Sequence, residues 1–436
     1  MNTIHTILLA ILVTTIGCSK PNFLVKNSDV APYLQQNGKA QKSEKTASQN
    51  LVFWQNRLAN DTGSYVNMMQ FGYACLQQFN IKGDVEFLWR ADSLFNRSNE
   101  ITQGKDDGIL LTLAQTAITT HRFSLAWDYV EAIAKIDHDP LTYNLVRFDA
   151  AMEMGYLDFA NQCLQRLQKK DGFDYLIRMA KLKDHLGDLE SAITCMEKAL
   201  DKARQTKSKG QIEWAVTNLS DMYGHNGEIK KACDGYKEAL GMDPANQYAL
   251  RGLGWIAFSH DKNPETANRI FTYLNGLTSM PDHLLTLGEI ARYTGDEEKA
   301  MNYFNAFAQK ASAPEYGNMY HKYLIAQYTH NLNQPAIALQ IASKELKNRY
   351  TSETVNWLAW ATFKAGQKEQ ATDLLYTPIN QQNHEPDALL QTAQMLQANG
   401  KSEQALAILN ELQDSQFELG PNKAKELDEL VRVYRN

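Results

Sequence analysis

The residues that could carry out chemistry are scattered through this chain of 436 residues instead of gathering in motifs. None of its ten histidines belongs to an HExxH pair or to a Cys/His cluster with the spacing of metal ligands. The nearest candidate, Asp137-His138-Asp139, precedes Pro140 and is interpreted as a solvated turn. No nucleotide-binding or nucleophile-elbow motif stands where a strand would support it. We therefore expect no metal, no cofactor and no catalytic activity.

Cys18 is the first reactive residue with a recognisable context. It follows residues 4–17, a run of about fourteen apolar or small residues that is too short to cross a bilayer but suits the hydrophobic region of a secretory signal. Thr15-Ile16-Gly17-Cys18 resembles the lipobox of bacterial lipoproteins, although Thr15 replaces the usual leucine and the leader has no lysine or arginine. The resemblance implies that residues 1–18 are a signal peptide ending at Cys18, which is acylated. The alternative is a plain cleaved signal with an incidental cysteine.

A lipid on Cys18 would anchor the protein in the cell envelope. Because Ser19, and not an acidic residue, follows the cysteine, the resemblance implies an outer-membrane protein that faces the periplasm. A secreted or surface-exposed protein is the alternative. Residues 19–50 are rich in Asn, Gln, Ser, Lys and Ala towards their end, and this composition predicts a flexible tether.

The composition of the whole chain is that of a globular protein, with 44% hydrophobic and 22% charged residues. A net charge of -6 provides no basic stripe for phosphates, so nucleic acid is not expected as a partner. Prolines are few, and abundant Ala, Leu, Gln, Glu and Lys favour helices.

A repeat of about 34 residues organises the chain. In its clearest copy, residues 213–244, small Ser220 and Ala232 allow two helices to cross closely, and Gly227 occupies the turn between them. With Trp214, Leu219, Tyr223, Tyr236, Ala239 and Pro244, this copy resembles the tetratricopeptide repeat. The alanine of the second helix recurs at Ala126, Ala160, Ala192, Ala232, Ala267, Ala300, Ala338, Ala371 and Ala405.

The resemblance covers residues 51–412 and implies an all-α fold, a right-handed superhelical solenoid of about ten helix-turn-helix repeats. Residues 413–436 are predicted to form a capping helix over the end of the solenoid. No segment remains that is long enough for a separate catalytic domain. Cys163 and Cys195 occupy equivalent sites on neighbouring second helices, roughly 8–10 Å apart, so we expect free thiols and not a disulfide.

In tetratricopeptide repeats the first helix of each pair lines a concave groove, and the resemblance assigns ten residues of this chain to that groove. They are Tyr248, Arg251, Trp255, Phe258, Arg292, Tyr293, Tyr320, Tyr323, Trp360 and Phe363. Aromatic rings in a concave surface bury apolar area at small entropic cost, as anchors for peptides or glycans do. The alternative is that about half of them pack between repeats, because a shift of one residue turns a helical side chain by about 100°.

These features predict a non-catalytic, membrane-anchored scaffold that holds peptides or partner proteins. One alternative is a glycan-binding outer-membrane lipoprotein of a nutrient-uptake system, although the long insertions of such proteins are missing here. The other is a regulatory subunit of a partner enzyme. The carboxylate clamp of chaperone-binding repeats is absent, because its positions hold residues such as Ile177 and Thr217.

Overall fold

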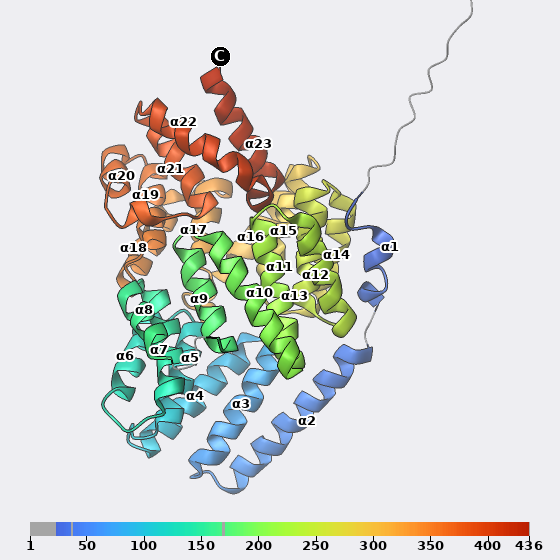
Figure 1. Cartoon of the computed structure of the whole chain (residues 1–436), viewed down its shortest axis with the longest axis vertical. Helices are drawn as coiled ribbons and strands as arrows, with labels where there is room; N and C mark the ends of the chain where they lie inside the picture. Colours follow the sequence, from blue (N-terminus) through green and yellow to red (C-terminus); the bar gives the residue numbers. More distant parts are fainter. Residues whose placement is uncertain (1–22, 36–37, 168–170, 436) are drawn as a thin grey trace, which may run out of the picture.

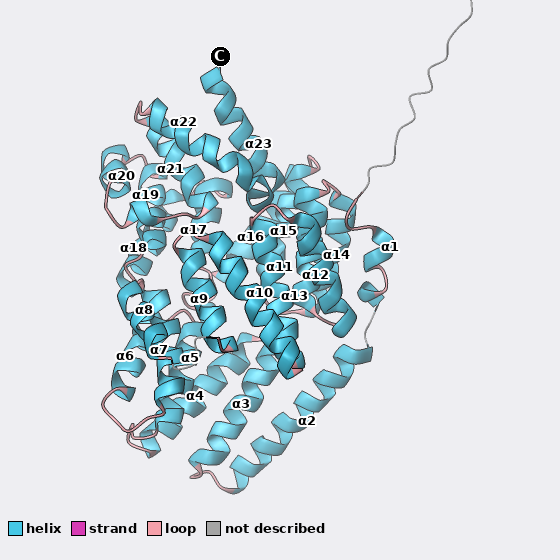
Figure 2. Cartoon of the chain, in the orientation of Figure 1, coloured by secondary structure: helices cyan, strands magenta, loops and turns pink. Residues whose placement is uncertain are grey.

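The computed structural model describes residues 23–35, 38–167 and 171–435. Helices make up nearly all of this part of the chain, and it contains no strand (Figure 2). Within the same ranges, no helix is both long and apolar enough to cross a membrane. The all-α solenoid expected from the sequence is confirmed.

Ten consecutive helix pairs form the body of the described chain, and the two helices of each pair pack on each other. The pairs are α3 (Tyr65–Lys82) with α4 (Val85–Ile101), α5 (Asp107–Thr119) with α6 (Phe123–Ile133), α7 (Pro140–Met154) with α8 (Leu157–Arg166), α9 (Phe173–His185) with α10 (Leu189–Thr206), α11 (Lys209–His225) with α12 (Ile229–Met242), α13 (Gln247–Trp255) with α14 (Pro264–Leu277), α15 (Asp282–Tyr293) with α16 (Glu297–Ala311), α17 (His321–Ala326) with α18 (Pro335–Asn348), α19 (Ser352–Lys364) with α20 (Lys368–Leu375), and α21 (Pro386–Ala398) with α22 (Ser402–Glu411). Before them lie α1 (Asn27–Val30), η1 (Tyr33–Gln35) and α2 (Gly38–Asn60), and after them η6 (Leu412–Ser415) and α23 (Gln416–Arg435).

The small residues of the repeat lie where helices touch. All nine repeat alanines are at most 1% exposed. The turn glycines Gly155, Gly187 and Gly227 have φ between 73° and 78°, a left-handed conformation that costs glycine little. These residues explain the period of the sequence, because alanine permits the close helix crossing and glycine permits the tight turn before it.

Two pairs depart from the regular pattern. α13 and α17 each continue into a π-helical turn, η2 (Ile256–His260) and η4 (Gln327–Asn331) respectively. The turns that follow contain no glycine, and Lys262 and Asn333 adopt left-handed φ of 51° and 49° instead. Since a π turn holds an extra residue, it shifts the register of the side chains after it. Turns of this kind often occur at functional sites. Short 3-10 turns, η3 (Pro314–Tyr316) and η5 (Asn380–Gln382), occupy two of the connections.

Residues 23–35 differ from the flexible tether predicted for residues 19–50. Val25 and Val30 are fully buried in the same apolar cluster as α12 and α14. The carboxylate of Asp261 accepts hydrogen bonds from the backbone N–H groups of Leu24, at 3.1 Å, and of Val25, at 2.8 Å. α2 covers most of the remaining stretch. The prediction is wrong for residues 23–35, because the polar composition farther along the segment gave no sign of two apolar anchors and their distant hydrogen-bond partner.

The superhelix turns far enough for early and late repeats to touch. Figure 1 shows α18 beside α6 and α8. There the hydroxyl of Ser124 donates to the carbonyl oxygen of Asn348 at 2.5 Å, and the Asn348 amide donates to the carbonyl oxygen of His121 at 3.0 Å. Trp89 of α4 likewise donates to the carbonyl oxygen of Glu315 in η3 at 2.5 Å. The chain itself therefore closes part of the inner face, which differs from an open groove along the whole rod.

The C-terminal segment does more than cover the last repeat. Leu427 and Val431, in the second half of α23, are buried against α21 and α22 as a cap would be. The first half is broken at Gly420, with φ 78° and ψ 168°, and Pro421 follows. This broken half reaches the middle of the molecule (Figure 1), where it packs against α11, η2 and α15.

Candidate binding surface

Three of the ten residues assigned to the groove are buried, which corrects that assignment. Phe258, Tyr320 and Trp360 are 1%, 4% and 2% exposed. The indole of Trp360 stacks on His330 and donates to the Thr329 hydroxyl at 3.1 Å. Phe258 lies in η2, and the partners of Trp360 lie in η4. The π turn η2 shifts the register at Phe258, whereas Trp360 packs on η4 and Tyr320, just before α17, packs on Phe307 and Tyr316.

Four of the ten residues remain accessible on first helices. Tyr248, Tyr293 and Tyr323 are 38%, 38% and 45% exposed, and Arg251 is also exposed. Phe363 is half-buried against Trp360. The accessible set therefore consists of three tyrosines and one arginine.

Asp221 holds Tyr248 in place. Its carboxylate accepts hydrogen bonds from the hydroxyls of both Tyr236 and Tyr248. The Arg251 guanidinium lies 4.4 Å from the centroid of the Tyr248 ring. Burial, and then the Asp221 carboxylate, raise the pKa of both tyrosines above its ordinary value. Tyr248 is thus a fixed, neutral ring suited to packing against a guest and not to proton transfer.

Arg292 is held by its own repeat and by the next one. Its guanidinium forms an ion pair with Glu297 at 2.8 Å and donates to Asn331 at 2.5 Å, while it lies 4.8 Å from the Phe304 ring centroid. The hydrogen bond from Arg292 is the first cause of a lowered pKa at Glu297. These contacts tie Arg292 to α16 and to η4 of the next repeat, so it is not free to bind an anionic guest.

Trp255 is covered by the C-terminal hook, which we define as residues 417–423. The Trp255 indole N–H and the Ser259 hydroxyl both donate to the Phe417 carbonyl oxygen, at 3.2 and 2.6 Å. A Cβ atom added to Gly224 would lie 2.9 Å from the Phe417 ring. One added to Gly420 would lie 2.8 Å from the Trp255 ring. Two glycines thus permit the hook to lie directly on α11 and α13.

The far end of the hook is fixed by polar contacts with later repeats. The Asn422 amide donates to both the carbonyl oxygen and the carboxylate of Glu289 in α15, at 2.9 and 2.6 Å. The Lys423 ammonium pairs with Asp387 of α21 at 2.6 Å. The hook therefore bridges middle and late repeats.

A cavity of about 540 Å³ lies beside the hook. The ends of α7, α9 and α11 line one side, and the starts of α19, α21 and α23 line the other. Its charged and histidine lining consists of Glu153, Asp184, Glu353, Glu385, Glu411, Glu418, Lys181, Arg349, His185, His225 and His384. Carboxylates outnumber fixed cations here. No group of three His, Cys, Asp or Glu within the described ranges could hold a metal ion.

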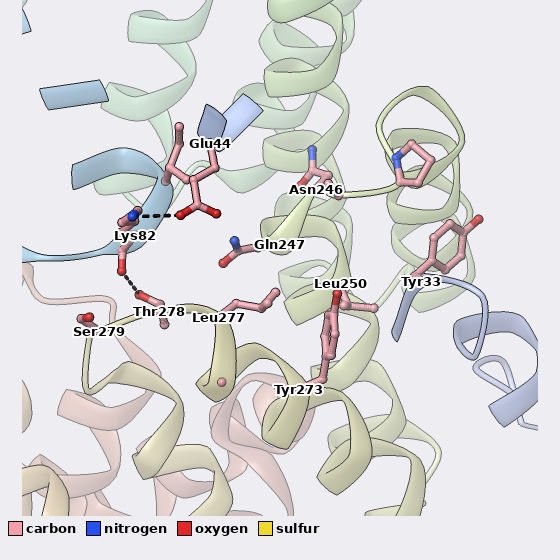
Figure 3. Close-up of a pocket in the computed structure, with 14 residues that line it drawn as sticks. Tyr33, Glu44, Lys82, Asn246, Gln247, Leu250, Tyr273, Leu277, Thr278 and Ser279 are labelled. Carbon is pink, nitrogen blue, oxygen red and sulfur yellow. Dashed lines mark hydrogen bonds and ion pairs between the residues drawn. The ribbon is translucent and has the colours of Figure 1, made fainter. Parts of the chain in front are cut away.

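A second pocket of about 330 Å³ lies where α2 and α3 meet α13 and α14 (Figure 3). Glu44 and Lys82 form a 2.9 Å ion pair at one end, and Tyr33 and Tyr273 flank the other end (Figure 3). Because its opposite charges are paired, this pocket offers a ligand mainly amide and hydroxyl groups. We interpret it as a cleft left by packing of the N-terminal helices.

The hook was missed by sequence reasoning, which assigned residues 413–436 to a cap. A local signal was present, because Gly420-Pro421 interrupts a helix and Phe417 is an apolar residue just before it. The target was not visible, since Gly224 and Ser259 lie far away in the sequence. The four cysteines that the structure describes are free thiols, as expected.

Comparison with known proteins identifies the repeat. The tetratricopeptide repeat profile matches residues 173–205, which form α9 and α10, and residues 387–416, which form α21, α22 and η6. The chain therefore contains tetratricopeptide repeats, a class generally associated with protein interaction. No curated protein matches the chain.

Solved structures also match the chain. A tetratricopeptide repeat protein from Parabacteroides merdae is 16% identical with a TM-score of 0.35, and the match covers 62% of this chain and all of that one. The human IFIT1 dimer with PPP-AAAA is 13% identical with a TM-score of 0.45, and the match covers 71% of each chain.

Proposed function

We propose that this protein is a lipid-anchored, non-catalytic scaffold of the cell envelope that binds a peptide or a partner protein through the first helices of its repeats. One observation carries the proposal. Consecutive helix pairs, two of which match the tetratricopeptide profile, account for nearly all of the described chain, and on the first helices Tyr248, Arg251 and Tyr323 stay accessible. Large rings and arginine are the residue types that most often anchor partners at interfaces.

The proposed anchor is a lipid on Cys18, supported by the leader and the lipobox-like sequence before it. Leu24 is already fixed to Asp261, and the six chain steps from Cys18 to Leu24 can span at most about 22 Å. The anchored body would therefore lie close to the bilayer surface. Ser19 favours the periplasmic face of an outer membrane, with a secreted or surface-exposed protein as the alternative.

The glycan-binding alternative loses its main support. Trp360 is 2% exposed and Trp255 lies under Gly420, so neither indole offers a free face for a sugar ring. A regulatory subunit of a partner enzyme remains compatible with a binding scaffold, because such a subunit would use the same surface.

The anchor is tested by replacing Cys18 with serine in cells. We expect the Cys18→Ser variant to move from the membrane fraction to the soluble fraction, because a serine cannot carry the thioether-linked lipid. Cys195→Ser is the matched control and should stay with the membrane. A Cys18→Ser variant that remains membrane-bound would refute the lipid anchor without touching the binding role.

The binding surface is tested by a photoreactive amino acid at Tyr248, with the same residue at Tyr376 as control. Tyr376 is also exposed, but it ends a second helix. We expect one discrete cross-linked partner at position 248 in intact cells and none at position 376. Equal cross-linking at both positions, or none at either, would contradict the proposed surface.

A further inference from the structure

The hook makes contacts that a cap does not need. Capping requires cover for the last helix pair, and Leu427 and Val431 supply it. The contacts of Phe417 with Trp255 and Ser259 instead cross about 160 residues of sequence. Deleting those contacts would leave the end of the solenoid covered, so they need another explanation.

The hook is bound as a peptide guest would be. Two side chains of the groove recognise the backbone carbonyl of Phe417, and the turn glycine Gly420 lies flat on the Trp255 ring. Recognition of the backbone, together with a seat for one aromatic ring, is how extended segments are held in grooves. The Phe417 ring does not fill the space available to it. A cavity of about 60 Å³ remains beside the ring, lined by Asp221, Tyr236 and Trp255 among others.

Glu418 fits its surroundings poorly. Its carboxylate shares the acidic cavity with Asp184 of α9, Glu385 before α21 and Glu411 of α22, and the Asp387 carboxylate also repels it. His225 of α11, at 3.8 Å, is the opposing group nearest Glu418. Lys181 and Arg349 also line the cavity. Lys423, on α23 itself, is paired with Asp387. Burial, and then the neighbouring carboxylates, raise the pKa of Glu418. A basic side chain at this place would meet attraction where Glu418 meets repulsion.

We propose that the C-terminal hook is an internal ligand of the groove formed by α11, α13 and α15, and that it holds the place of a partner peptide in which an aromatic residue is followed by a basic one. This inference rests on the proposed binding function and adds the chemistry of the guest. A guest without the Glu418 mismatch displaces the hook, because the internal ligand is held by proximity more than by fit.

The test uses the full-length chain in detergent and two labelled synthetic peptides, residues 412–424 with the natural sequence and the same peptide with Glu418→Lys. Fluorescence anisotropy gives the dissociation constants. For the wild-type chain we expect the lysine peptide to bind at least tenfold more tightly than the natural one. A Phe417→Ala chain, whose hook has lost its ring, should bind both peptides at least tenfold more tightly than the wild-type chain does.

Two glycine variants distinguish loss of the binding site for the Phe417 ring from a general loss of stability. Gly224→Ala places a methyl group where the Phe417 ring sits, so this chain should bind neither peptide. Gly241→Ala, also near the end of a helix but with open space around it, should behave as the wild type. The thermal unfolding transition of each chain shows that it is folded.

The proposal is overturned if the folded Phe417→Ala chain binds neither peptide, or if Gly224→Ala binds them as well as Phe417→Ala does. Equal affinity of the two peptides would show that the guest does not need a basic residue after the aromatic one. In each case cross-linking at Tyr248 still reports on the binding function by itself. If the peptide experiment contradicts the hook proposal while the cross-link at Tyr248 persists, only the hook proposal is wrong. If the cross-link is missing as well, the proposed binding function is also wrong.

Discussion

Asp261 shows how one side chain can order a segment that composition marks as disordered. Its carboxylate is 1% exposed, accepts the two backbone bonds from Leu24 and Val25, and lies 2.8 Å from the His260 ring nitrogen. Lys237 adds a bond to the carbonyl oxygen of Leu24 at 3.1 Å. Hydrogen bonds to an ionised, buried acceptor are among the stronger ones in proteins.

Replacing Asp261 with alanine should release residues 24–30 from the body. Loss of a charged acceptor for two amides costs about 2 kcal/mol, or roughly a 30-fold change in the local opening equilibrium. Hydrogen exchange of these amides should accelerate by about that factor. Asp296→Ala removes a helix N-cap elsewhere and should leave their exchange unchanged. Unchanged exchange in Asp261→Ala would show that Val25 and Val30 hold the segment without it.

The accessible and buried rings of the first helices show what alignment to the repeat period can and cannot predict about a binding site. The repeat period placed Tyr248 and Arg251 on the accessible side of a first helix. It misplaced Phe258, because a π turn has no signature in the alanine series. It could not reveal that Phe417 covers Trp255, since that contact depends on how far the superhelix turns.

Within single helix pairs, a glycine of the first helix faces an aromatic ring of the second. Gly288 of α15 faces Phe304, and an added Cβ would lie 2.4 Å from that ring. Gly72 of α3 faces Phe95 of α4 in a similar way, with 2.3 Å to the ring. The elements were predictable because several pairs repeat this local fit of small against large residues. The connections were not, since η3 and the turns at Lys262 and Asn333 follow no repeated residue.

Gly288→Ala and Gly276→Ala should change stability in opposite directions. The first forces a methyl group against Phe304 and should lower the free energy of unfolding by about 1–3 kcal/mol. The second sits near the end of α14 with open space around it and should raise stability by about 0.5–1 kcal/mol, because alanine restricts the unfolded chain. Urea titration measures both. Equal effects would mean that the pair can open enough to accept the extra methyl group.

The seam between early and late repeats turns the solenoid into a closed body. Arg349 is its centre, with 10% of its side chain exposed, ion pairs to Glu153 at 3.7 Å and Glu353 at 3.1 Å, and the Phe123 ring centroid 4.8 Å away. No repeat pattern predicts such a seam, because it depends on small rotations accumulated over many pairs. The fold class was therefore readable from the sequence, whereas the closure that decides which surface is free was not.

His121 makes this seam sensitive to pH. Burial is the first cause of its lowered pKa, and Arg349 lowers it further, while the carboxylates of Glu153 and Glu345 oppose the shift. A histidine whose pKa is lower in the folded state favours folding fully above its unfolded pKa of about 6.5, and this contribution is lost as the pH falls through the lowered value.

His121→Asn keeps a residue that tolerates the left-handed φ of 54° and removes the titrating group. In urea unfolding between pH 7.5 and 5, the free energy of unfolding should therefore fall less steeply in the variant than in the wild type. The two slopes should differ by up to about 1.4 kcal/mol per pH unit for one proton. The slope is the readout, because loss of the ring contact with Phe123 lowers stability equally at every pH. Identical slopes in both proteins would show that His121 takes up its proton over the same pH range in the folded and unfolded chain, and this result would remove the seam as a pH-sensitive element.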